Sequence, residues 1–186
     1  PAARRARLNM ENSSSTADQR AAAVHLLVLD EDVILNDGRI YYGNDGEELK
    51  AFNIKDGRWI KMLQKTGVRV AIITGRQSEI VARRARELGI GDVIQGREDK
   101  RQALLELCQD LQLSLADCAY MGDDLPDLGA ITACGLGMTV ADASAAVRRG
   151  ADWVSKRNGG EGAVREACEF IIGARGAWSK IEAEFA

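Results

Sequence analysis

A short apolar run that ends in carboxylates constrains the fold of this chain more than any other stretch. Residues 26–29 are Leu-Leu-Val-Leu, and Asp30, Glu31 and Asp32 follow them. An apolar run of strand length bounded by polar residues is typical of a buried strand. In an open α/β sheet, ligands bind outside the carboxyl ends of the strands. The stretch therefore predicts a buried strand that brings Asp30 and Asp32 to a functional site.

The rest of the chain is predicted to alternate between strands and helices. Strands are expected near residues 25–29, 68–73, 92–95, 118–121, 136–140 and 153–154. Helices are expected near residues 56–66, 78–88, 100–111, 127–133, 143–149 and 163–172, and a further helix is possible at the end. This alternation with short connections predicts a Rossmann-like α/β fold, in which helices cover both faces of a parallel sheet.

A protruding β-hairpin is predicted at about residues 39–53. The runs 40–42 and 48–52 flank Gly-Asn-Asp-Gly at residues 43–46, which is a turn signal. An isolated two-stranded hairpin is marginally stable in water, so we expect this one to pack on something, for example another subunit.

Length and composition favour a single globular domain. Residues 1–22 are expected to form a mobile N-terminal tail or a short helix, and residues 23–186 one domain whose C-terminal tail starts near residue 156. The net charge of −3 gives no reason to expect nucleic acid as a partner. The absence of a long apolar run argues against a membrane span, and four scattered cysteines favour reduced thiols in the cytoplasm. His25 is the only histidine, which excludes a site built from several histidines.

Polar residues follow several of the predicted strands and are expected to converge on one edge of the sheet. They are Asp30 and Asp32 after the first strand, Thr74-Gly75-Arg76 after the second, Lys100 at the start of a helix, and Gly122-Asp123-Asp124 with Asp127 after the strand 118–121. Carboxylates that meet there repel one another unless a cation lies among them, and an oxygen-only site suits Mg²⁺. A hydroxyl, a lysine and backbone N–H groups beside that metal form a cradle for a phosphoryl group.

In these motifs and their order, the chain resembles the haloacid dehalogenase superfamily of phosphotransferases. More narrowly, it resembles the capless, tetrameric branch that contains the 3-deoxy-D-manno-octulosonate 8-phosphate phosphatases. The resemblance is carried by residues 46–53 (GEELKAFN), 72–76 (IITGR), 95–100 (QGREDK), 122–127 (GDDLPD) and 159–166 (GGEGAVRE). It implies a fold without a cap domain, a Mg²⁺-dependent phosphatase of lipopolysaccharide precursor synthesis, and a homotetramer. It also implies a C-terminal region that reaches a neighbouring subunit's active site.

The resemblance also implies a role for each site residue. Asp30 is expected to attack phosphorus and form an aspartyl-phosphate, and Asp32 to act as acid and then as base. Asp30, Asp123 and the backbone carbonyl of Asp32 are expected to hold Mg²⁺, and Asp124 to help the metal site or to orient Lys100. Thr74 and Lys100 are expected to bind phosphoryl oxygens. The implied substrate contacts are Asn53, Lys55, Asp56, Gly57, Lys61, Gly75, Arg76, Arg84 and Lys100.

Simpler interpretations stay open for several of these residues. Thr74 could cap the following helix, and Asp124 and Asp127 could cap the short helix near residue 127. Lys61 and Arg84 could lie on solvated helix faces, and Lys100 could be a solvated residue of a first helical turn. Asp30 and Asp32 could be N-cap or turn residues. The glycine-rich stretch before Arg165 could be a flexible lead into the last predicted helix.

Two positions depart from the pattern of the superfamily. Val33 and Asn36 stand where the resembled proteins usually have glycine and threonine. A β-branched residue tolerates the backbone geometry of glycine poorly, so Val33 could shift the loop that carries Asp32. The chain could therefore instead be a weakly active oligomerisation module, or a phosphatase for another sugar-acid phosphate such as a nonulosonate 9-phosphate.

Overall fold

A six-stranded parallel sheet forms the centre of the molecule. The computed structural model describes residues 16–185. In spatial order the strands are β5 (Asp92–Ile94), β4 (Arg69–Ile73), β1 (Leu26–Leu29), β6 (Cys118–Met121), β7 (Leu136–Thr139) and β8 (Trp153–Val154). Each strand pairs with its neighbour in parallel. The predicted parallel α/β sheet is confirmed.

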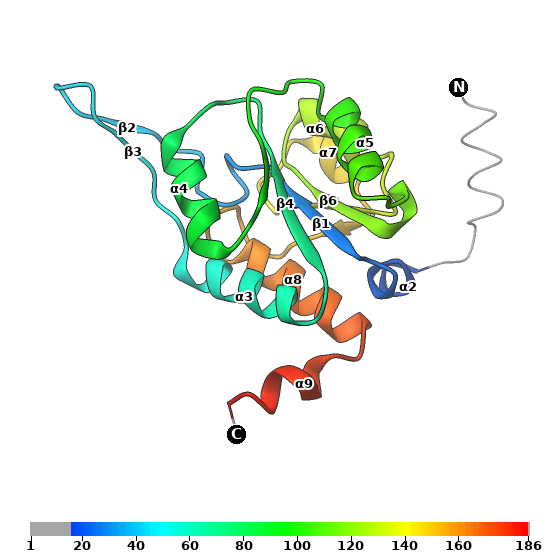
Figure 1. The fold of residues 1–186 in the computed structure, drawn as a ribbon. Coiled ribbons are helices and arrows are strands. Elements are labelled where there is room, and N and C mark those ends of the chain that lie inside the picture. The colour runs from blue at the N-terminus through cyan, green and yellow to red at the C-terminus, as the bar shows by residue number, and fades with distance from the viewer. Residues whose placement is uncertain (1–15, 186) are drawn as a thin grey trace, which may run out of the picture.

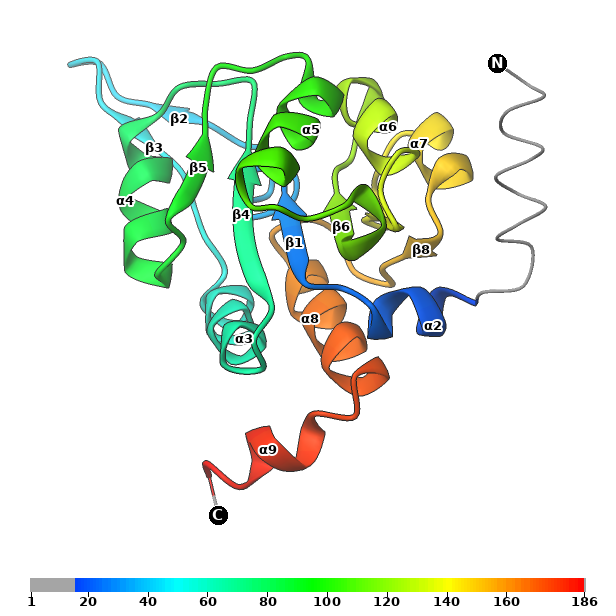
Figure 2. The ribbon, with the colours of Figure 1, turned by 45° about the vertical axis from the view of Figure 1, so that its right-hand side comes forward.

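Helices cover both faces of this sheet (Figures 1 and 2). On one face α3 (Ile54–Lys65) packs against α8 (Ala163–Ala174), with α2 (Ala17–Ala22) beside α8 and α4 (Glu79–Leu88) beside α3. The opposite face carries α5 (Lys100–Asp110), α6 (Leu125–Ile131) and α7 (Ala145–Gly150). A 3₁₀ turn (Leu115–Asp117) precedes β6, and α9 (Trp178–Glu182) follows α8.

Burial on both faces explains why the sequences of the central strands are mostly apolar without alternation. All four residues of β1 and all four of β6 are buried, because helices cover the sheet on both faces. In α8 the buried residues recur at helical spacing and line the side that faces the core; they are Ala163, Val164, Ala167, Cys168, Ile171 and Ile172.

The strand register places the predicted site residues at one edge. Leu29 of β1 lies opposite Ile72 of β4 on one side and Met121 of β6 on the other. The Asp30 N–H extends this register by donating to the Met121 carbonyl oxygen at 2.9 Å. The segments that follow β1, β4 and β6 therefore leave the sheet side by side.

A narrow hairpin projects from the domain between β1 and α3 (Figure 1). It consists of β2 (Tyr41–Tyr42) and β3 (Glu48–Leu49), paired antiparallel, and Tyr42 at 71% is one of its exposed apolar side chains. Over residues 16–185 the chain contains no cap domain, as predicted. None of the helices in that range is both long and apolar enough to cross a membrane.

The N-terminal segment has the helical alternative over part of its length. Residues 17–22 form α2, and residues 1–15 lie outside the described part of the chain. Thr16 and Gln19 form a capping box at the start of α2, and Ala21 is fully buried. Within the C-terminal segment from about residue 156, the helix predicted near residues 163–172 is confirmed as α8, whose buried side faces the core.

Candidate active site

A buried lysine links the ends of two strands. Lys100, the first residue of α5, places its Nζ 2.7 Å from Asp30 Oδ2 and 2.8 Å from Asp127 Oδ1. All three side chains are less than 10% exposed. A buried ammonium shared by two carboxylates is held in one position, because moving it would leave buried charges unpaired.

Asp127 contacts Lys100 and also holds the turn that follows β6. Its Oδ1 accepts from Tyr120 Oη at 2.9 Å, and its Oδ2 accepts from the Asp123 and Asp124 N–H groups at 3.2 and 3.3 Å. Gly122 makes room for this carboxylate, since an ideal Cβ there would overlap it. The interpretation of Asp127 as a helix cap thus holds in part, and its contact with Lys100 also places it in the site.

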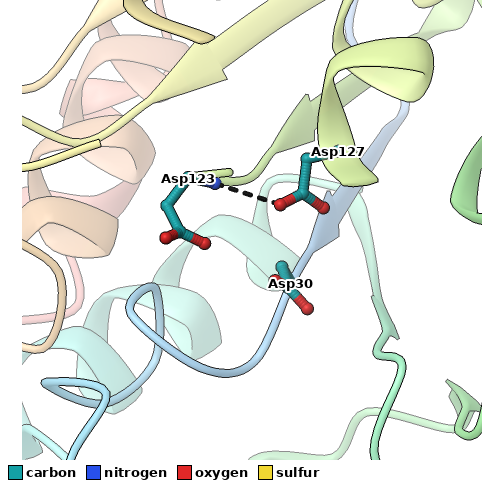
Figure 3. Close-up of side chains that lie close together, drawn as sticks. All are labelled: Asp30, Asp123 and Asp127. Carbon is teal, nitrogen blue, oxygen red and sulfur yellow. Dashed lines mark hydrogen bonds between the residues drawn. The ribbon is translucent and has the colours of Figure 1, made fainter. Parts of the chain in front are cut away.

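Three aspartates form an acidic group at this edge. One carboxylate oxygen each from Asp30, Asp123 and Asp127 lies within 4.8 Å of the others (Figure 3). Burial and the neighbouring carboxylates raise the pKa of Asp30 to about 6 and that of Asp123 to about 7. Three carboxylates lie around the single ammonium group of Lys100, and a divalent cation stabilises such a buried acidic group.

Asp124 does not belong to this group. Its side chain is exposed, and it stands at the N-cap position of α6. The expected help from Asp124 in metal binding stays a prediction, while the open alternative of a helix-capping position describes what the structure contains.

The loop that carries Asp32 is held by buried polar side chains. Val33 has a φ of +61°, in the left-handed region that favours glycine. Asn36 bridges the loop: its Oδ1 accepts from the Val33 and Gly38 N–H groups at 3.2 and 2.7 Å. The loop therefore keeps the geometry expected for glycine with valine in its place.

Lys50, at the base of the hairpin, reaches the same loop. Its Nζ lies 2.7 Å from Glu31 Oε2 and 2.8 Å from Asp32 Oδ1. Burial raises the pKa of Glu31 to about 7. Burial also acts to raise the pKa of Asp32, but hydrogen bonds from Lys50 and Asn36 outweigh it and lower that pKa below its usual value.

The glycine-rich stretch after β8 packs directly against the Asp32 loop. An ideal Cβ on Gly159 would overlap the Val33 carbonyl oxygen, and one on Gly160 would overlap the Asn36 backbone. The Gly160 N–H donates to Ile34 O at 3.1 Å, and the Gly160 carbonyl accepts from Asn53 Nδ2 at 3.0 Å. This stretch is thus a close-packed support of its own chain's site.

The residues after β4 complete the edge. Thr74 is buried, and its Oγ1 accepts from the Arg76 N–H at 3.3 Å. Glu98 lies against Gly75, where an ideal Cβ would come within 2.6 Å of Glu98 Oε1. The half-exposed Arg76 places its Nε 3.7 Å from Asp32 Oδ2. Among the predicted substrate contacts, the structure brings Arg76 and Lys100 to the carboxylates of the site.

Asn53 and Asp56 prove to be capping residues. Asn53 caps α3, with its Oδ1 accepting from the Lys55 N–H at 2.8 Å. Asp56 is 1% exposed, and its Oδ1 accepts from the Arg165 N–H at 2.7 Å, in the first turn of α8. Because Gly162 at the N-cap of α8 has no side chain, Asp56 supplies the missing cap from α3. Its predicted contact with substrate stays a prediction, and the structure shows the carboxylate buried at the start of α8.

The other predicted contacts on α3 and α4 lie in packing or surface positions. Gly57 is buried against Arg84, whose guanidinium would overlap an ideal Cβ there. Arg84 also lies over the Phe52 ring, 5.6 Å from its centroid. The Arg84 and Gly57 predictions are therefore unsupported by this packing, since each contacts neighbouring helices. Lys55 and Lys61 are exposed on α3, which for Lys61 agrees with the simpler interpretation.

Sequence reasoning missed the roles of three residues. Tyr120 lies inside a buried strand, and only its hydroxyl distinguishes it from an apolar core residue. Glu31 offered a signal, because it is a charge directly beside a buried strand. Lys50 offered none, since its contacts with residues 31 and 32 depend on how the hairpin returns to the domain.

Comparisons with known proteins agree with this geometry. Residues 85–167 match the model of the haloacid dehalogenase-like hydrolases. The chain is 46% identical to the 3-deoxy-D-manno-octulosonate 8-phosphate phosphatase of Yersinia pestis over 154 residues, covering 83% of this chain and 82% of that protein. The phosphatase of the same name from Escherichia coli K12 is 43% identical over 157 residues, covering 84% of both proteins.

A solved structure extends the similarity to three dimensions. The 3-deoxy-D-manno-octulosonate 8-phosphate phosphatase of Moraxella catarrhalis, in complex with magnesium ion, phosphate ion and KDO, superposes with a TM-score of 0.90 at 44% identity. The match covers 91% of this chain and 98% of that one. Relatives of this identity, matched over most of their length, show that the chain belongs to the haloacid dehalogenase-like hydrolases, in the family of the 3-deoxy-D-manno-octulosonate 8-phosphate phosphatases.

Proposed function

We propose that the protein hydrolyses 3-deoxy-D-manno-octulosonate 8-phosphate to the free sugar acid and phosphate, a step of lipopolysaccharide precursor synthesis. The observation that carries the proposal is the buried Lys100 between Asp30 and Asp127, with Asp123 beside them. This arrangement offers a carboxylate nucleophile, a fixed cation and an acidic metal site within one edge of the sheet. The relatives that are 43–46% identical over most of their length support the choice of substrate.

Mg²⁺ fits the donor set of this site. Asp30 and Asp123, with the backbone carbonyl of Asp32, would hold the ion, and Asp124 would assist. The proximity of the Asp30, Asp123 and Asp127 carboxylates supports this assignment, since their oxygens are donors that Mg²⁺ prefers. When bound, Mg²⁺ neutralises charge between the nucleophile and the phosphate and so allows the two anions to approach.

The side chains of this chain then divide the chemistry. Asp30 attacks phosphorus and forms an aspartyl-phosphate, while Asp32 gives a proton to the leaving sugar oxygen. In the second step Asp32 takes a proton from water, and the carboxylate form favoured by Lys50 and Asn36 suits this step. Lys100 and the Thr74 hydroxyl bind the phosphoryl oxygens, where negative charge develops in the transition state.

Recognition of the sugar acid requires cations outside the phosphoryl site. Arg76 is half exposed beside Asp32 and is the best-placed cation for the substrate carboxylate. Lys55 and Lys61 are exposed on α3 and are weaker candidates.

We infer that the enzyme is a homotetramer in the cytoplasm. The projecting hairpin exposes Tyr41, Tyr42 and Leu49, which supports its burial against other copies of the chain. The cysteines of the described part are free thiols, as is typical of cytoplasmic proteins.

A panel of sugar phosphates tests the proposal. We expect phosphate release from 3-deoxy-D-manno-octulosonate 8-phosphate with Mg²⁺, faster than from a nonulosonate 9-phosphate, and loss of activity with a chelator. Faster release from the nonulosonate 9-phosphate would make that ester the assigned substrate instead. No release from any ester, with a stable oligomer in light scattering, would instead favour an inactive oligomerisation module.

A further inference from the structure

A fully buried ion cluster lies directly behind the Asp32 carboxylate. The side chains of Glu31 and Lys50 are both 0% exposed, while Asp32 is 25% exposed. Glu31 and Asp32 are adjacent in the chain, and Lys50 directly follows β3 at the base of the hairpin. A charge this deeply buried is costly unless every partner is in place, so the cluster holds its members in fixed positions.

The hydrogen-bond capacity of Lys50 is fully used. Its ammonium group lies 2.9 and 2.7 Å from the two Glu31 carboxylate oxygens and 2.8 Å from Asp32 Oδ1. An ammonium has three N–H groups, so none remains for a phosphate. Lys50 therefore acts on the site through Asp32.

Asn36 is saturated in the same way. Its Nδ2 donates to Glu31 Oε1 at 2.5 Å and to Asp32 Oδ1 at 3.0 Å, while its Oδ1 accepts from two backbone N–H groups of the loop. Asp32 Oδ1 thus receives two donors, and both are anchored to Glu31. Only Oδ2 remains for the reaction, beside Arg76.

We propose that Lys50, anchored by Glu31 and assisted by Asn36, is a positioning residue that holds the Asp32 carboxylate for hydrolysis of the aspartyl-phosphate. The inference rests on the proposed phosphatase function. In that step water attacks phosphorus, its proton passes to Asp32, and the bond between phosphorus and the Asp30 oxygen breaks. The products are inorganic phosphate and a free Asp30 carboxylate, and the rate depends on the orientation of Asp32 toward the water.

The test follows p-nitrophenyl phosphate in a rapid-mixing experiment with Mg²⁺ present. p-Nitrophenolate leaves without needing a proton, so its burst counts active sites and the later steady rate reports hydrolysis of the phospho-enzyme. Lys50→Met is expected to give a burst of about one p-nitrophenolate per site and a steady rate about 10- to 100-fold below wild type. Lys50→Arg should recover most of that rate. Lys65→Met, at an exposed lysine of α3, serves as the matched control and should behave as wild type.

A second variant guards against misfolding of Lys50→Met, which leaves Glu31 buried without its partner. The double variant Glu31→Gln, Lys50→Met leaves no unpaired buried charge there and should show the same slow steady rate. A loss confined to the burst amplitude, with an unchanged rate per active site, would give Lys50 a structural role only and overturn the proposal.

Two further outcomes separate this inference from the proposed function. A raised KM with unchanged kcat would make Lys50 a substrate ligand and overturn the positioning role. A wild-type protein that releases phosphate from neither p-nitrophenyl phosphate nor 3-deoxy-D-manno-octulosonate 8-phosphate would overturn the proposed function, and this inference with it.

Discussion

Two sides of the site are built in different ways. On the Lys100 side, the carboxylates come from the ends of β1 and β6 and from the start of α6, and Lys100 is the first residue of α5. On the Asp32 side, an irregular loop is held by side chains and glycines from segments far apart in the chain. The first side depends on regular elements, and the second depends on individual contacts.

The difference shows where each side tolerates change. Strand register and helix starts set the positions of Asp30, Lys100 and Asp127, and Gly122 makes room for the Asp127 carboxylate. The Asp32 side contains a residue at a φ of +61° and glycines that touch the loop backbone. We expect substitutions of Asp30 and Lys100 to remove chemistry, and substitutions of Val33 and of the glycines that support the Asp32 loop to change stability.

The largest effect is expected at Asp30, the proposed nucleophile. Asp30→Asn should lower turnover by roughly 10⁴-fold or more, because the amide cannot form the aspartyl-phosphate. The fold should persist, since Lys100 keeps its contact with Asp127. Phosphate release and thermal unfolding measure the two quantities. Asp110→Asn, at an exposed position of α5, is the control, and turnover of Asp30→Asn near wild type would remove Asp30 from the nucleophile role.

The sequence predicts the Lys100 side better than the Asp32 side for the same physical reason. Apolar runs and the residues that end them locate the strands, and a parallel sheet brings their ends together. The positions of Asp30, Thr74, Lys100 and Asp123 followed from this rule. The contact of Lys50 with residue 32 could not follow, because hairpin twist and loop packing are not encoded in a local pattern.

The supposed substrate contacts on α3 illustrate the same limit. Asn53 and Asp56 are polar residues near a site in sequence, yet both satisfy backbone N–H groups of helices. A polar residue near the start of a helix can cap a helix or contact a ligand. The sequence alone does not distinguish the two roles, because a cap can be supplied to a helix far away in the chain. For Asp56 that partner is α8, more than 100 residues later.

A second prediction tests the close support of the Asp32 loop. Gly159→Ala should lower the free energy of unfolding by about 3 kcal/mol, because the new Cβ would overlap the Val33 carbonyl and force backbone to move. Chemical denaturation measures this change. Gly91→Ala is the matched control, since an ideal Cβ there meets no atom within 4 Å. Equal unfolding free energies of the two variants would mean that the Asp32 loop adjusts to the added methyl group at little cost. The proposed difference between the two sides of the site would then be wrong.

A third prediction concerns Asp56, which caps the helix that follows the glycine stretch. Asp56→Ala should cost about 1–2 kcal/mol of unfolding free energy, because the Arg165 N–H loses its acceptor. Asp56→Asn keeps an acceptor and should cost less. The matched pair separates the cap from the charge in chemical denaturation at pH 7.

The pH dependence of the same pair has a definite sign. Burial raises the pKa of Asp56 in the folded protein, so the folded state binds this proton more readily than the unfolded chain does. Wild type should therefore gain stability relative to Asp56→Asn as pH falls through the raised pKa toward the usual carboxyl pKa. A constant difference between the two proteins over that range would contradict the buried position of the charge.

The smallest effect is expected at Val33, and it has the opposite sign. Val33→Gly should raise the free energy of unfolding by about 1 kcal/mol, because a β-branched residue at a φ of +61° stores more strain than glycine loses in chain entropy. Gln112→Gly is the matched control, since Gln112 has a φ of +57° but no branch at Cβ, and its gain should be smaller. Denaturation of both variants measures the difference. If Val33→Gly is less stable than wild type, the contact of Val33 with Gly38 outweighs the strain, and valine stabilises the Asp32 loop by packing.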